Sequence, residues 1–486
     1  MVLNPLSDQV LLFLHSNHKH HRRWNFLLTG RLFGLTLLIV LLASCAPQTR
    51  NTSLPLETAQ AFSDSGLHNA PDKGWRAFED PQLNQLVDSG LSANFNLKTA
   101  WQRLRAAQAV VDRESSSLFP DLETSLNGQL NGPASRVSQT ENLRLGLSSV
   151  YEIDLWGRIR SQVEAERYRA KASMMDYQTA ALSLSAEMVR TWYQLAEARK
   201  QLSIVEQQVE TDERVLELIR ARFGNGQIRS VDIIRQRRLL EATREQKMAA
   251  ETRIQVLEHQ LAVLSGRQPQ LKTESSLDSL PKLPPIPETG IPIELVKRRP
   301  DIQSAYNRLR SADRELASAI SSRYPRLTLS ASLSSSAGNI NDLFENWAYS
   351  VAGNLLAPVF YGGRLNAEVR RMEAVKKQRL YEYGQTVLTA FREVEDALIQ
   401  EKKQKERIGS IEKQLALARQ SYQQLRIEYF NGMGNYLDVL TALDEQQQLR
   451  RDLSSARLRL LEYRIALYRA LSGGFEIQKE VADNGR

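Results

Sequence analysis

The segment Ser117-Leu-Phe-Pro-Asp-Leu122 returns as Ser322-Arg-Tyr-Pro-Arg-Leu327, 205 residues further along the chain. In both copies a helix-like sequence ends before the proline and is followed by alternating polar and apolar residues. The residue before a proline disfavours the helical conformation, and a period of two is typical of a β-strand. The same change from helix to strand therefore occurs twice, which places the two segments at equivalent points of a repeated unit.

Three more pairs of segments have the same separation, within 205 to 207 residues. They are 155–159 with 361–365, 222–226 with 429–432, and 231–232 with 437–438. A constant offset across separate landmarks indicates duplication of a whole unit. We expect one repeat over residues 75–266 and a second over 293–474, joined by a linker over 267–292 in which several prolines prevent a helix.

Each repeat contains two segments in which polar and apolar side chains alternate for about ten residues. The apolar positions are Leu122, Leu126, Leu130, Leu143, Leu145, Leu147, Tyr151 and Ile153 in the first repeat, and Leu327, Leu329, Ala331, Leu333, Trp347, Tyr349, Val351 and Leu355 in the second. Alternation of this length is typical of transmembrane β-strands. A soluble hairpin with one face on a core is the other interpretation of the same pattern.

Long helices are expected before and after these strands along the chain. A first helix is expected over 81–117 and again over 293–322. Residues 158–223 contain no proline or glycine, and a helix of about 65 residues spans on the order of 100 Å. Returning helices are expected over 230–265 and 436–472, after turns that contain glycine.

The apolar residues of the long helices recur at alternating separations of three and four, which is the spacing of coiled coils. In the first repeat they are Leu202, Val205, Val209, Leu216, Ile219 and Phe223; in the second they are Ile408, Ile411, Leu415, Ala418, Tyr422, Leu425 and Tyr429. In the first series, Asp212 occupies a position where an apolar residue is expected. The pattern predicts that these helices pack along most of their length.

The N-terminal segment has the features of a secretory signal. Basic residues precede an apolar run over 32–43, which is too short to span a membrane comfortably and ends in Leu42-Ala-Ser-Cys45. This ending resembles a bacterial lipobox, and Cys45 is the only cysteine of the chain. We expect residues 1–44 to be removed, Cys45 to carry lipid, and 45–74 to form an extended N-terminal segment. The alternative is a buried free cysteine after an uncleaved anchor helix. The tail over 475–486 has no periodic pattern and is expected to be disordered.

Composition argues against several other functions. A single cysteine excludes an internal disulfide and a cysteine-based metal site. The formal charge of +8 is spread along helices instead of forming a patch, so it gives little support for nucleic-acid binding. No serine-hydrolase motif, paired-carboxylate cleft or phosphate loop is present, which argues against an enzyme and against a cofactor.

Four strands per chain are too few to close in a membrane. Bacterial barrels need at least eight strands, because an open sheet edge leaves backbone groups unpaired in lipid. The chain is therefore expected to form oligomers. Two copies would supply eight strands and three copies twelve, and twelve strands can enclose a water-filled lumen. The long helices would continue the wall as a periplasmic tube.

Several motifs together resemble the TolC-type outer-membrane efflux proteins. They are Trp75-Arg-Ala-Phe-Glu-Asp-Pro-Gln-Leu83, Arg298-Arg-Pro-Asp-Ile302, the strand entries at Phe119-Pro120 and Tyr324-Pro325, and Gly362-Gly-Arg-Leu365. The lipobox is similar to that of the lipoprotein branch of this family. The resemblance covers about Trp75 to Gly474 and implies a mostly α-helical protein with a transmembrane β part. It also implies a homotrimer with a twelve-stranded β-barrel, continued by a periplasmic α-helical barrel.

The resemblance further implies a passive duct that exports small molecules across the periplasm and outer membrane and catalyses no reaction. Its partners would be a periplasmic adaptor protein, an inner-membrane pump of the resistance-nodulation-division type, and outer-membrane lipid. Two other functions stay open: a coiled-coil lipoprotein that tethers the envelope, and the duct of a type I secretion system.

Candidate site residues follow from the same resemblance. Tyr429 and Asp438 match positions of the family's periplasmic gate, and Asp232 is the first-repeat equivalent of Asp438. Arg222 and Arg229 are candidates for the ion partners of Asp232. Capping or the helix dipole is the alternative role for both acids. The helix-turn tips at Gly224, Gly226, Gly432 and Gly434 are expected to contact the adaptor. Gly434 and Thr441 stand where the family often has a basic or second acidic residue, so the closing contacts differ here.

Overall fold

The computed structural model describes residues 61–66, 68–69, 73–131, 140–270 and 280–475. The predicted signal peptide, Cys45 and the tail after Phe475 lie outside these residues. The described chain forms two compact units. We call Val110–Arg167 with Arg310–Lys377 the strand unit, and the described remainder the helical unit.

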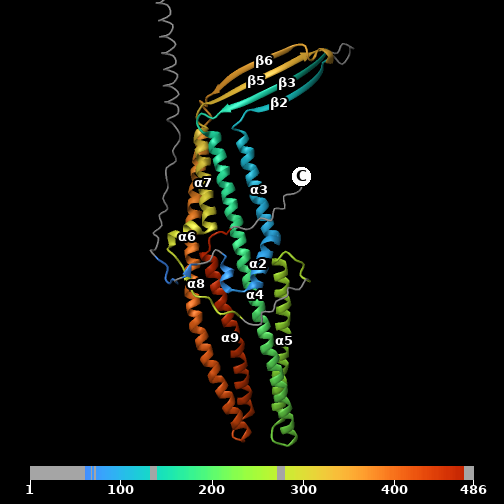
Figure 1. The fold of residues 1–486 in the computed structure, drawn as a ribbon, viewed down its shortest axis with the longest axis vertical. Coiled ribbons are helices and arrows are strands. Elements are labelled where there is room, and N and C mark those ends of the chain that lie inside the picture. Colours follow the sequence, from blue (N-terminus) through green and yellow to red (C-terminus); the bar gives the residue numbers. More distant parts are fainter. Residues whose placement is uncertain (1–60, 67, 70–72, 132–139, 271–279, 476–486) are drawn as a thin grey trace, which may run out of the picture. The chain divides into compact units, whose positions relative to one another are not determined.

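The strand unit contains one antiparallel sheet of four strands (Figure 1). The strands are β2 (Asp121–Asn131), β3 (Thr140–Ile153), β5 (Arg326–Ala337) and β6 (Trp347–Leu356), in the order β2-β3-β5-β6. All four were predicted from the alternating segments, and the structure confirms them. The two repeats join in the middle of the sheet, where Leu147 lies opposite Leu333. The outer strands β2 and β6 each pair with one neighbour, so both edges of the described sheet are open.

Within the strand unit, the strand-to-helix motif of the first repeat meets the helix-to-strand segment of the second. The indole ring of Trp156 stacks on Tyr324, with ring centroids 5.0 Å apart. Its Nε1 donates a hydrogen bond to the carbonyl oxygen of Pro325 at 2.7 Å, and the hydroxyl of Ser321 donates to the carbonyl oxygen of Trp156 at 2.9 Å. A motif of the first repeat therefore fixes the strand entry of the second.

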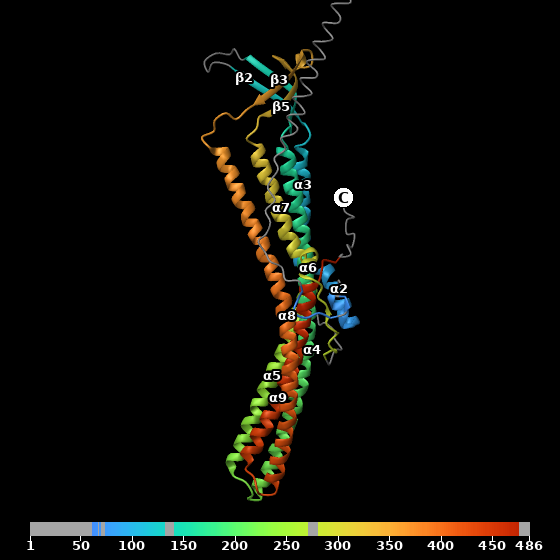
Figure 2. The ribbon, with the colours of Figure 1, turned by 90° about the vertical axis from the view of Figure 1, so that its left-hand side faces the viewer.

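The remaining secondary structure is mostly helical. The helices are α2 (Pro81–Ala93), α3 (Phe95–Ser116), α4 (Arg158–Gly224), α5 (Ser230–Leu264), α6 (Pro292–Arg298), α7 (Pro300–Ser321), α8 (Arg364–Phe430) and α9 (Tyr436–Leu471). The short elements are η1 (Gly74–Phe78), η2 (Ile340–Asp342), and the parallel pair β1 (His68–Asn69) and β4 (Pro287–Glu288). Within the helical unit, α4 with α5 forms a first hairpin and α8 with α9 a second (Figures 1 and 2).

The expected helices over 81–117 and 293–322 are each divided in two. Asn94 interrupts the first: its side-chain oxygen accepts from the N–H of Leu97 at 3.1 Å, and its Nδ2 donates to the carbonyl oxygen of Leu264 at 2.9 Å. Arg299 interrupts the second, because it precedes Pro300 and adopts an extended conformation. The prediction of one continuous helix at each place was wrong.

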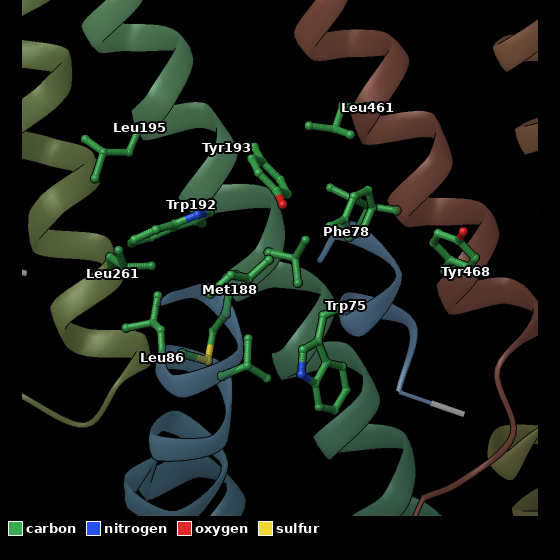
Figure 3. Close-up of a cluster of buried hydrophobic side chains, with 14 of the residues drawn as sticks. Trp75, Phe78, Leu86, Met188, Trp192, Tyr193, Leu195, Leu261, Leu461 and Tyr468 are labelled. Carbon is green, nitrogen blue, oxygen red and sulfur yellow. The ribbon is translucent and has the colours of Figure 1, made fainter. Parts of the chain in front are cut away.

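The largest apolar core of the helical unit lies where α2, α4, α5, α9 and η1 meet (Figure 3). Trp75 and Phe78 of η1 pack there with Trp192 and Tyr193 of α4 and Tyr468 of α9. The indole Nε1 of Trp192 donates to Asp80 at 2.9 Å. This core joins the first hairpin to α9 of the second hairpin.

Candidate functional site

In each of the two hairpin turns, one of the two predicted tip glycines has a positive φ and the other does not. Gly226 and Gly432 have φ of 71° and 77°, a left-handed conformation that glycine adopts at no steric cost. Gly224 is the last residue of α4, and neither it nor Gly434 has a positive φ. All four predicted tip glycines are exposed.

The two acids predicted for the gate lie in different surroundings. Asp232 is 4% exposed and accepts from Arg235 at 3.4 Å, and Arg229 lies 3.8 Å from its other oxygen. Asp438 is exposed, in the first turn of α9, where a negative charge interacts favourably with the helix dipole. The capping residue of α9 is Asn435, whose side chain accepts from the N–H of Leu437. Of the two acids, Asp438 is therefore the one available to solvent.

The third predicted gate residue, Tyr429, contacts other groups mainly through its ring. The ring lies 5.6 Å from that of Tyr436, and the guanidinium of Arg222 lies 5.1 Å from it. Arg222 also lies 4.6 Å from the ring of Phe430. The hydroxyl of Tyr429 is buried and finds no hydrogen-bond partner within the described residues. Arg222 thus joins the hairpins by cation–π contacts. Its predicted ion pair with Asp232 was wrong, because among the described residues Asp232 pairs with Arg229, as predicted, and with Arg235.

The hydroxyl group that does link the hairpins belongs to Tyr436. It donates to the Oε1 atom of Gln236 at 2.5 Å, which connects α9 to α5. Both residues are buried, and burial raises the pKa of the Tyr436 hydroxyl far above its ordinary value. The hydroxyl therefore keeps its proton and remains a donor. Apolar residues seal the contact: Ile219, Leu239, Leu440, Val215, Ile228 and Ile233.

A buried carboxyl group lies next to this contact. Asp212 of α4 is fully buried, and its Oδ2 atom accepts from the hydroxyl of Thr243 at 2.8 Å. Its Oδ1 atom accepts from Gln447 at 3.4 Å, and its backbone oxygen accepts from Gln236 at 3.0 Å. Burial raises the pKa of the Asp212 carboxyl, although these hydrogen bonds partly oppose the shift. Sequence reasoning noted Asp212 in the apolar series but missed its partners.

Within the described residues we find no group of acidic, histidine or cysteine side chains that could hold a metal ion. Across the same part of the chain, none of the helices combines the length and apolar character needed to span a membrane. The site consists of helix ends joined by aromatic, polar and charged contacts, which hold the ends of the two hairpins together.

Known proteins are similar to this one over most of the chain. A family model described as "Outer membrane efflux protein" matches residues 86–267 and 291–473. The chain is 30% identical over 466 residues to the pyoverdine export outer membrane protein OpmQ of Pseudomonas putida, covering 92% of this chain and 97% of OpmQ. It is 26% identical over 447 residues to the cation efflux system protein CusC of Escherichia coli, covering 89% and 96%.

Solved structures agree with the family match. The outer-membrane channel OprN has a TM-score of 0.78 at 30% identity, covering 88% of this chain and 99% of OprN. The open state of the MtrE outer membrane channel of Neisseria gonorrhoeae has a TM-score of 0.79 at 24% identity, covering 88% and 98%, and so shows the fold alone. Together with the duplicated architecture, these matches show that the chain belongs to the outer membrane efflux protein family.

Proposed function

We propose that this protein is the outer-membrane channel of a tripartite efflux system, and that three copies form a passive duct for small molecules. The observation that carries the proposal is the four-stranded sheet with two open edges, β2 and β6. In lipid, each unpaired backbone group costs several kcal/mol, so a sheet of this kind is stable there only when other strands close it.

A trimer would close the sheet and leave room for a lumen. Three copies contribute twelve strands, which can enclose a water-filled lumen. Leu126 on one edge strand is 68% exposed and Tyr349 on the other is 84% exposed, so apolar side chains are available to lipid or to another copy. In this arrangement the repeats over 75–266 and 293–474 each supply two strands to the barrel and one hairpin to the periplasmic tube.

The remaining partners follow from the architecture and the family. A periplasmic adaptor would contact the exposed tips at Gly224, Gly226, Gly432 and Gly434, where Met433 also projects with 74% of its surface exposed. An inner-membrane pump, of the resistance-nodulation-division type, would supply energy to the assembly. Lipid on Cys45 would add a second attachment to the outer membrane.

The gate is proposed at the hairpin ends. In a trimer, three copies of the exposed Asp438 would form a ring of acids, which attracts cations and slows anions. Asp232 would stabilise the first hairpin through Arg229 and Arg235. Tyr429 would act through its ring, beside Arg222 and Tyr436.

Chemical cross-linking tests the assembly. One cysteine is introduced on each edge strand, at Glu123 of β2 and Ser350 of β6, and membranes are treated with a short bismaleimide. We expect a ladder of products that ends at three chains. Each single-cysteine variant, as a control, should lose the three-chain product. A double variant that stays monomeric, or a ladder that continues beyond three, contradicts the proposed trimer.

A further inference from the structure

The buried network around Asp212 connects three helices from both hairpins. Asp212 belongs to α4, Thr243 and Gln236 to α5, and Gln447 and Tyr436 to α9. Gln236 occupies the centre, because its Nε2 donates to the backbone oxygen of Asp212 while its Oε1 accepts from Tyr436. Separation of the second hairpin from the first would break the contacts of both Tyr436 and Gln447 and admit water to the carboxyl group.

The hydrogen-bond arrangement around Thr243 can accommodate a protonated Asp212. The Thr243 hydroxyl has one proton but two acceptors within reach, Asp212 Oδ2 at 2.8 Å and the carbonyl oxygen of Leu239 at 3.1 Å. If Asp212 is ionised, that proton can serve only one of them. If Asp212 is protonated, its own O–H donates to Thr243, whose proton is then free for Leu239. The acid form thus lets both hydrogen bonds form at once. Burial raises the pKa of Asp212 and outweighs the hydrogen bond from Thr243 to the ionised form, which lowers the pKa.

The charged groups near Asp212 are few. Asp444 of α9 opposes its ionisation, while Arg451 of α9 interacts with it favourably and donates to Gln208 at 2.7 Å. On α5 the groups that touch Asp212 are neutral, and the nearby Arg244 is paired with Glu213 and Glu241. The remaining titratable group is the Tyr436 hydroxyl, which keeps its proton. The carboxyl group therefore lacks a directly bonded cation within the described residues.

We propose that Asp212 is a positioning residue that holds the second hairpin on the first while it carries a proton, and that loss of this proton favours separation of the hairpins. The inference rests on the proposed channel function, because separation at these ends is what would widen the duct. Asp212 acts through the packing of the hairpins and does not touch the exported molecule.

The direction of the pH effect follows from the two states. With the hairpins packed, burial raises the pKa of Asp212. With the hairpins apart, the hydrated carboxyl returns to its ordinary range. The packed arrangement is therefore fully favoured below the ordinary pKa, and the advantage is lost as the pH rises through the raised pKa. Each unit of difference between the pKa values of Asp212 in the packed and separated states changes the ratio of packed to separated hairpins about tenfold.

Spin labels can measure the separation directly. Cysteines replace the exposed Gln227 and Met433, one in each turn, and labelled chains are diluted with unlabelled ones in the full assembly. We expect the short distance to dominate at low pH and a longer one to grow as the pH rises through the raised pKa of Asp212. Asp212→Asn is neutral but can still donate to Thr243, so it should keep the short distance at every pH. Glu217→Gln, an exposed acid on the same helix, should behave like the wild type.

The outcomes separate the inference from the proposed function. A wild-type distance that is independent of pH overturns the inference, and so does an Asp212→Asn variant that retains the wild-type pH profile. An Asp212→Asn variant with separated hairpins at every pH would show a purely structural role and also overturns it. Channel recordings on the same protein report separately on function, since pores without pH-dependent separation refute only the role of Asp212.

Discussion

The long helices of the two hairpins have the same length, but the side chains that are buried between the helices differ. Helices α4 and α8 each contain 67 residues and begin 206 residues apart. At the position of Asp212 the second repeat has the buried Ala418, and at the position of Gln236 it has Ala442. Duplication therefore preserved the backbone lengths, while the second repeat has alanines in place of Asp212 and Gln236, two members of the buried polar network.

A second pair of equivalent positions shows the same divergence higher in the hairpins. In the first repeat, Arg199 pairs with Glu258 at 3.0 Å, and both are partly exposed. In the second, the equivalent of Glu258 is Arg464, which is fully buried and binds both oxygens of Glu401 at 2.6 and 2.8 Å. Arg464 also donates to the carbonyl oxygens of Pro284 and Pro285 in the linker. Its charge therefore fastens the connection between the repeats.

The largest expected effect comes from breaking this buried pair. Glu401→Gln leaves the Arg464 guanidinium buried without its counter-charge, which should cost about 3–5 kcal/mol. The melting temperature of the purified assembly, followed by circular dichroism, should fall clearly. Glu258→Gln is the matched control and should cost about 1 kcal/mol or less, because its pair is partly exposed. Equal losses in the two variants would contradict the contrast.

The same pair predicts a pH dependence opposite to that of Asp212. Burial alone raises the pKa of Glu401, but hydrogen bonds from Arg464 and Lys405 outweigh it and the pKa is lowered. The ion pair therefore stabilises the protein above the ordinary glutamate pKa, and this contribution is lost as the pH falls through the lowered pKa. The melting temperature of the wild type should fall more steeply in acid than that of Glu401→Gln. Parallel pH profiles would show that the pair contributes no such linkage.

A carboxyl group placed in the second hairpin tests whether the donors around Asp212 are what makes a buried carboxyl group tolerable. Ala418→Asp buries a carboxyl group without the donors that surround Asp212, which should cost about 2–4 kcal/mol at neutral pH. The cost should shrink in acid, because the neutral acid is cheaper to bury. Thermal melts at pH 5 and pH 8 measure this, with Ala418→Ser as the control for size. A loss that does not depend on pH would point to crowding instead.

The two tyrosines near the turns offer a smaller contrast. Tyr436→Phe removes the hydrogen bond to Gln236 and leaves its buried oxygen with one donor fewer, at a cost of about 1–2 kcal/mol. Tyr429→Phe removes a hydroxyl that has no partner within the described residues, so its cost should lie within about 0.5 kcal/mol. Denaturation of the two variants side by side measures the difference. A larger loss of stability in Tyr429→Phe than in Tyr436→Phe would contradict the conclusion that Tyr436 carries the hydroxyl group that links the hairpins.

The smallest effect on stability is expected at Asp438. Asp438→Asn should change stability by less than about 0.5 kcal/mol, because the side chain is exposed. It should nevertheless lower the preference for cations, measured as the reversal potential under a salt gradient. Asp232→Asn, its buried equivalent, should instead cost about 1 kcal/mol and leave the reversal potential unchanged. An unchanged reversal potential in Asp438→Asn would remove this residue from the proposed gate.

The strands and long helices could be predicted from the sequence because the patterns that indicate them are local. Alternation predicted β2, β3, β5 and β6, and the absence of glycine and proline predicted the long helix α4. The interruption at Asn94 was missed because it depends on a contact with the carbonyl oxygen of Leu264, 170 residues away. The interruption at Arg299 had a local signal, Pro300, which the coarser pattern obscured.

The site was less predictable because its contacts are distant in sequence. Asp212 meets Gln447 across 235 residues, and Tyr436 meets Gln236 across 200. The only local sign was a single polar residue in an apolar series. Arg222 could be recognised as a nearby cation, but only the fold shows that two aromatic rings lie beside it.

The most direct test of the channel is current through a planar bilayer containing the purified, full-length assembly. The account predicts discrete, uniform current steps that favour cations, because three open-edged sheets would close into one water-filled barrel. Protein that inserts into the bilayer yet stays electrically silent at every voltage and pH would contradict it.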